Sequence, residues 1–120
     1  MLKSILIIEP NFKLQQPYQL LSSDLFAVTR VTNQSQAAAL LEKKSFDLIM
    51  LSCSFSASKS LNLLTMLNQH QRKQITPLIL VVDLSKRYSL VLGTTWAKQL
   101  SIVHSQTKQA ELNTTLSRFL

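Results

Sequence analysis

The sequence predicts an α/β fold, with a parallel sheet between two layers of helices, mainly because of three short apolar runs. The runs and the residues that follow them are Leu2–Ile8 before Glu9-Pro10, Phe46–Leu51 before Ser52, and Leu78–Val82 before Asp83. Runs of this length, rich in Ile, Leu and Val and separated by helical patterns, are typical of buried parallel strands. Functional crevices of such sheets lie beyond the carboxyl ends of the strands, so we expect any site at the residues that end these runs.

Five segments have the composition of strands. They are Lys3–Ile8, Phe26–Val31, Asp47–Leu51, Leu78–Val82 and the weaker Ser101–Val103. Phe26–Val31 alternates apolar and polar residues and is expected at an edge, whereas the continuous runs Asp47–Leu51 and Leu78–Val82 are expected at the centre. A sheet of this kind needs a crossover helix after each strand, and the crossovers should be right-handed.

Helical spacing of apolar residues is clear in three segments between or after these strands. They are Ser35–Lys44, Lys59–Gln69 and Gln109–Phe119. Ser35 and Ser58 are the expected N-caps of the first two. Two further helices are expected, one after Asn11, where Pro17 should kink or delay it, and one within Ser85–Ala97, which contains Gly93.

The bulk composition describes one globular domain over residues 1–120. Apolar residues make up 46% of the chain, which excludes disorder, and no apolar run approaches the roughly 18 residues that span a bilayer. The first residues lack a cleavage site and are expected to form a strand rather than a signal peptide. The single cysteine, Cys53, cannot form an internal disulfide, so a reducing cytoplasm is the expected location.

The net charge of +7 favours an acidic partner, whether a protein, a nucleic acid or an anionic surface. The basic residues are scattered, and no arginine-rich run, stacking motif or helix-turn-helix pattern accompanies them. A protein partner is therefore expected, a nucleic acid is not, and no membrane association is expected.

Four motifs, in order and at matching intervals, resemble the receiver domains of two-component response regulators (CheY-like domains). Ile-Leu-Ile-Ile-Glu-Pro-Asn is similar to their first strand and acidic pair, and Phe-Asp-Leu-Ile-Met-Leu-Ser is similar to the third strand, which normally ends in Asp. Thr-Pro-Leu-Ile-Leu-Val-Val is similar to the fourth, and Ser-Ile-Val-His-Ser stands where the fifth ends in Lys-Pro. The resemblance implies a flavodoxin-like (βα)5 doubly wound sandwich with a five-stranded parallel sheet in the order 2-1-3-4-5.

The resemblance also implies a chemistry in which a histidine kinase phosphorylates an aspartate beside Mg²⁺ and a lysine. Such transfer depends on charge stabilisation, and here Glu9 remains while the other charged groups are replaced. The positions that correspond to the phosphorylation site are Glu9, Pro10, Ser52, Val82, Ser101 and His104. Ser52 replaces the acceptor aspartate, and Pro10 removes one carboxylate of the acidic pair. Val82 replaces the switch hydroxyl, Ser101 the switch aromatic and His104 the lysine.

The other reactive residues do not form the pattern of a catalytic or metal site. We expect no catalytic residue, no metal site and no cofactor, because the chain has no cluster with metal-ligand spacing, no glycine-rich loop and no activated nucleophile. Cys53 is expected to be a small buried residue, and His104 is either a pH-sensitive group or a structural one. Asp47 is expected to be structural, since it lies at the opposite end of its strand from the pocket.

In the receiver family, the face formed by the fourth helix, fifth strand and fifth helix commonly carries output and dimer contacts. The candidate interface residues on this face are Lys86, Arg87, Tyr88, Trp96, Lys98 and Lys108. Such a basic and partly aromatic surface suits an acidic signalling protein, and a homodimer through the same face is the other arrangement considered.

The expected function is therefore that of a degenerate receiver, or pseudo-receiver: a phosphorylation-independent protein–protein interaction module in two-component-type signalling, and not an enzyme. The alternative is a small-ligand or redox sensor that uses the vacated phosphorylation pocket beside Ser52, Cys53 and Val82.

Overall fold

The computed structural model describes residues 2–10, 18–21, 24–52, 57–71, 76–82, 100–104 and 108–120. Its centre is a five-stranded, fully parallel sheet in the order β2-β1-β3-β4-β5. The strands are β1 (Lys3–Ile8), β2 (Phe26–Val31), β3 (Leu48–Ser52), β4 (Leu78–Val82) and β5 (Leu100–His104). The predicted fold class, the strand order and the edge position of Phe26–Val31 are confirmed.

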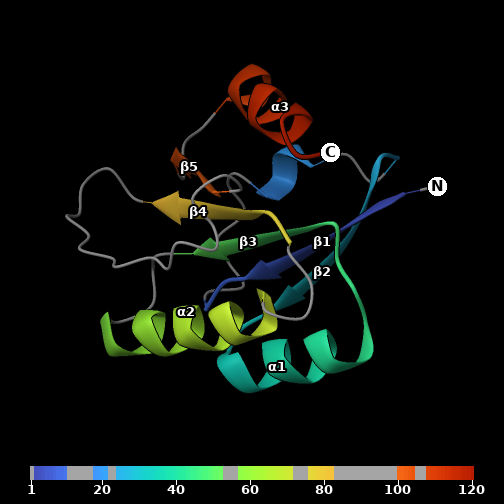
Figure 1. Ribbon diagram of the computed structural model, residues 1–120. Coiled ribbons are helices and arrows are strands. Elements are labelled where there is room, and N and C mark those ends of the chain that lie inside the picture. The colour runs from blue at the N-terminus through green and yellow to red at the C-terminus, as the bar shows by residue number, and fades with distance from the viewer. Residues whose placement is uncertain are drawn as a thin grey trace.

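Helices lie on both faces of the sheet (Figure 1). Two helices, α1 (Gln34–Lys43) and α2 (Ala57–Gln71), cover one face, and α3 (Gln109–Ser117) lies on the other with the short 3₁₀ turn η1 (Tyr18–Leu20). The helices expected after Asn11 and within Ser85–Ala97 fall on segments outside the described residues. Among the described helices, none is both long and apolar enough to cross a membrane.

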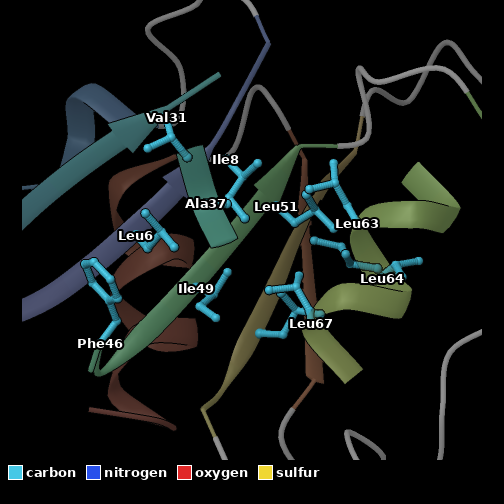
Figure 2. Packing of buried hydrophobic residues seen from close by; sticks show 12 residues of the cluster. Leu6, Ile8, Val31, Ala37, Phe46, Ile49, Leu51, Leu63, Leu64 and Leu67 are labelled. Carbon is cyan, nitrogen blue, oxygen red and sulfur yellow. The ribbon is translucent and has the colours of Figure 1, made fainter. Parts of the chain in front are cut away.

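Each face of the sheet has its own apolar layer because successive side chains of a strand point to opposite faces. Leu6, Ile8, Ile49 and Leu51 pack against α1 and α2, as Figure 2 shows, and Leu63, Leu64 and Leu67 reach them from α2. Ile5, Ile7, Leu48 and Met50 point the other way, toward Tyr18 and α3. Residues 5–8 and 48–51 are almost fully buried, which is why these strands are apolar at every position rather than alternating.

The structure corrects the predicted helix starts. Ser35 and Ser58 are not N-caps, because α1 begins at Gln34 and α2 at Ala57, and both serines lie inside their helices. The cap of α1 is Asn33, whose side-chain oxygen accepts a hydrogen bond of 2.9 Å from the Gln36 backbone N–H. The Gln36 side chain in turn accepts from the backbone N–H and hydroxyl of Thr32. These bonds between Gln36 and the two residues before the helix hold the first turn of α1 in place after Asn33.

Replacing Asn33 with alanine should therefore lower the free energy of unfolding by about 1 kcal/mol, because the Gln36 N–H loses its acceptor. Ser35→Ala is the matched control. It removes an exposed hydroxyl inside the same first turn and should change the stability by less than about 0.5 kcal/mol. Urea unfolding followed by circular dichroism measures both variants. Equal losses, or a larger loss for Ser35→Ala, would contradict the cap seen here.

At the amino end of the sheet, Asp47 joins the start of β3 to β1. Its carboxylate accepts hydrogen bonds from the backbone N–H of Ser4 at 2.8 Å and from the Ser4 hydroxyl at 3.2 Å. The backbone N–H of Asp47 donates back to the Ser4 carbonyl at 2.9 Å. The contacts of Asp47 therefore join two strands at the edge opposite Ser52, as a structural role requires.

Candidate functional site

The carboxyl ends of β1 and β3 lie side by side and bring two of the predicted site residues together. Ile8 pairs with Leu51, so the next residues, Glu9 and Ser52, are neighbours at the same edge of the sheet. Both are about 2% exposed. Such burial is unusual for a carboxylate like that of Glu9. Pro10 follows Glu9 and is partly exposed.

The remaining positions of the predicted site are described only by their backbone. Val82 ends β4 and pairs with His104 at the end of β5, so both lie at the same edge as Ser52. Ser101 pairs with Ile79, at the opposite end of these strands, and is thus separated from the others. Of the candidate interface residues, only Lys108 is described: it is exposed and precedes α3. Lys86, Arg87, Tyr88, Trp96 and Lys98 lie outside the described residues, as does Cys53.

A tyrosine that the sequence did not indicate completes the site. Tyr18, in η1, is buried, and its hydroxyl donates a hydrogen bond of 2.8 Å to Glu9 Oε1. The Ser52 side chain is also hydrogen-bonded to the Tyr18 hydroxyl. One phenolic oxygen therefore contacts both strand-end residues, and we call Glu9, Tyr18 and Ser52 the strand-end cluster.

Arg30 of β2 adds the only positive charge described against this cluster. Its guanidinium carbon lies 5.1 Å from the centre of the Tyr18 ring, within the range of a cation–π interaction. Burial raises the pKa of the Tyr18 phenol, and the Glu9 carboxylate raises it further by charge repulsion and by accepting its proton in a hydrogen bond. Ser52 and Arg30 act in the opposite direction without reversing the shift. The phenol is thus a neutral donor at physiological pH.

The signal that could have indicated Tyr18 is weak. Tyrosine is the aromatic residue that carries a hydrogen-bonding hydroxyl into an apolar layer, and Tyr18 follows Glu9 by nine positions. Nothing local, however, shows that the chain turns back over the sheet at this point. The hydroxyl meets Glu9 only because the ring joins the apolar layer formed by Ile5, Ile7 and Met50.

These residues do not fit a Mg²⁺ ion. Magnesium requires near-octahedral oxygen coordination, usually with carboxylates and several waters. Here Pro10 and Ser52 supply no carboxylate, Glu9 is buried, and its Oε1 already accepts a hydrogen bond from the Tyr18 hydroxyl. Among the described residues, no group of three His, Cys, Asp or Glu side chains could hold a metal ion.

A pocket of about 420 Å³ opens near this cluster but does not include it. It is lined by Pro10, by residues 32–35, which connect β2 to α1 and begin that helix, and by Lys59 and Leu63 of α2. Ser52 is not part of its wall, so this pocket is not the space beside Ser52 that the alternative ligand-sensing hypothesis invokes.

Comparison by sequence gives no matching family model and no matching curated protein. Comparison of structures gives many receiver domains. The receiver domain of a sensor histidine kinase from Pseudomonas aeruginosa, solved with a magnesium ion in its active-site cleft, is 19% identical with a TM-score of 0.76, over 99% of this chain and 98% of that one. The chemotaxis response regulator CheY4 of Vibrio cholerae is 15% identical with a TM-score of 0.74, over the whole of both chains.

A third neighbour is the signal receiver domain of an HD domain-containing protein from Pseudomonas fluorescens. It is 21% identical with a TM-score of 0.71, over 99% of this chain and 94% of that one. These identities are low, but the alignments cover the chain almost from end to end, with TM-scores of 0.71 to 0.76. This chain therefore has the CheY-like receiver fold.

Proposed function

We propose that this chain is a degenerate receiver domain, which acts as a phosphorylation-independent protein–protein interaction module in two-component-type signalling. The observation that carries the proposal is the strand-end cluster. A receiver needs an acceptor carboxylate and a second charge-bearing group at this edge of the sheet. Here Ser52 ends β3 and the Glu9 carboxylate is engaged by a neutral phenol.

The chemistry of these groups supports the loss of phosphoryl transfer. A serine hydroxyl is a weak nucleophile unless a base activates it, and the hydroxyl of Ser52 contacts a phenol whose own pKa is raised. Without a bound cation, the Glu9 carboxylate would repel an incoming phosphoryl group. We accordingly propose that the domain is not an enzyme and has no catalytic residue.

The proposed partner is an acidic cytoplasmic signalling protein, because the chain carries a net charge of +7 without a nucleic-acid-binding motif. Binding would use the basic face that includes Lys108, and a homodimer through that face is the competing arrangement. Ligand sensing beside Ser52 has less support, since the Tyr18 phenol already contacts both Ser52 and Glu9.

Incubation with acetyl phosphate and Mg²⁺, followed by intact-mass measurement, tests the proposal. The wild-type chain should gain no phosphoryl group. Ser52→Ala is the matched control, because it removes only the hydroxyl at the acceptor position and should give the same unchanged mass. Any phosphoryl adduct on the wild-type chain would refute the proposal. A hydroxylamine-sensitive adduct is an acyl phosphate on a carboxylate, whereas a hydroxylamine-resistant adduct that Ser52→Ala lacks is a phosphate ester at Ser52.

A further inference from the structure

We propose that the Tyr18 phenol occupies the position at the carboxyl ends of β1 and β3 that a divalent cation would need, and that it closes this edge of the sheet to such ions. The inference deepens the proposed function and rests on it, because it names what holds the strand ends once phosphorylation is lost.

The Tyr18 hydroxyl oxygen lies where a shared ligand of residues 9 and 52 would lie. It is 2.8 Å from Glu9 Oε1 and is hydrogen-bonded to the Ser52 side chain, so the ends of two adjacent strands converge on it. A cation that bridged side chains at these two positions would need the same space. The phenol and a hydrated ion therefore exclude one another.

The Tyr18 phenol can act as the hydrogen-bond donor of the buried Glu9 carboxylate, whereas a hydrated cation has no room to do so. A single O–H donor satisfies one carboxylate oxygen without the shell of waters that Mg²⁺ retains. Glu9 and Tyr18 are 2% and 7% exposed, and the 2.8 Å contact between their oxygens leaves no room for a water between them. Hydrogen bonds to ionised groups are also among the stronger ones in proteins.

The Tyr18 ring, like its hydroxyl, has defined contacts. It packs in the apolar layer of the α3 face, with Ile5 and Ile7 of β1 and Met50 of β3. On β2, the guanidinium of Arg30 lies over the ring. Side chains from three adjacent strands therefore lie against the phenol, and a cation could reach this position only if a buried aromatic residue left the core.

Manganese binding to variants of the full chain tests this closure. Ser52→Asp supplies the carboxylate that the end of β3 lacks, and Tyr18→Ala removes the phenol. With Mn²⁺ as the probe, the free ion measured by electron paramagnetic resonance gives the Kd. Ser52→Asp/Tyr18→Ala should bind Mn²⁺ about tenfold or more tightly than Ser52→Asp alone, since no phenol competes. Ser52→Asn/Tyr18→Ala, without the added charge, is the control and should lose that gain.

Equal Mn²⁺ affinity of Ser52→Asp with and without Tyr18 would overturn the closure. If the alanine variants do not fold, Tyr18→Phe keeps the ring and removes only the donor. Its equilibrium constant for unfolding should rise about tenfold or more, since Glu9 loses a buried donor, and wild-type stability of Tyr18→Phe would overturn the proposal. Failure of the proposed function is separate, because it appears as a phosphoryl adduct on the wild-type chain.

Discussion

Replacing Ile49 with alanine should lower the free energy of unfolding by about 2 to 5 kcal/mol, the range for large-to-small changes in tightly packed cores. Ile49 is fully buried in the central strand β3 and pairs with Leu6 on one side and Leu78 on the other. Its side chain faces α2, near Leu67 (Figure 2). Since strands on both sides and a helix above hold the site, the cavity left by the change has little room to collapse.

Two further variants make this prediction specific, with urea unfolding as the measurement. Val28→Ala, on the edge strand β2, shortens a side chain that is 43% exposed and should cost less than about 0.5 kcal/mol. Ile49→Val removes one methyl group and should cost about 0.5 to 1.5 kcal/mol, which keeps the site measurable if the alanine variant does not fold. Similar losses for Ile49→Ala and Val28→Ala would contradict the placement of Ile49 at the centre of the core.

The wild-type chain should lose stability above pH 10 more steeply than Tyr18→Phe does. In the unfolded chain the phenol ionises near its ordinary pKa of about 10. In the folded chain its pKa is raised, first by burial and then by Glu9. Between the two values the folded state keeps a proton that the unfolded state releases, so folding becomes less favourable as pH rises.

The contribution of Tyr18 is thus fully present below about pH 10 and declines above it by about 1.4 kcal/mol per pH unit. Urea unfolding of both chains from pH 8 to pH 11.5 measures the difference. Both chains retain Tyr88, so its ionisation contributes equally to the two profiles and drops out of the comparison. The charged groups described against the phenol, Glu9 and Arg30, are also unchanged. Parallel pH profiles for the two chains would show that the phenol is not held in its protonated form.

The sheet could be predicted from the sequence because its determinants are local. Every residue of β1 from Ile5 to Ile8 and of β3 from Leu48 to Leu51 is apolar, and burial on both faces requires that composition. The predicted and observed ends of the elements differ by one or two residues. For example, β3 ends at Ser52, whereas the predicted strand ends at Leu51. The start of α1 was misplaced because Asn33 and Ser35 are both good caps, and the choice depends on the bond between Gln36 and Thr32.

The site could be predicted only in part. Glu9 and Ser52 follow from the strand ends, since parallel strands place their carboxyl ends at one edge. Tyr18 does not follow, because its contact with Glu9 depends on the ring joining the layer beside Ile5 and Met50, a choice made by tertiary packing. The resemblance to receivers indicates positions 9 and 52, whereas the Tyr18 hydroxyl that contacts Glu9 is visible only in the folded chain.

The polar contacts at the two ends of β3 have a consequence for strand alignment. Leucine and isoleucine occupy both faces of β1 and β3, so a shift of one residue would exchange side chains of similar volume and would change the buried apolar area little. Such a shift would, however, separate Asp47 from Ser4 at one end of β3. At the other end it would separate Ser52 from the Tyr18 hydroxyl that binds Glu9. These few polar groups therefore specify one alignment of the central strands among several that the apolar residues alone would accept.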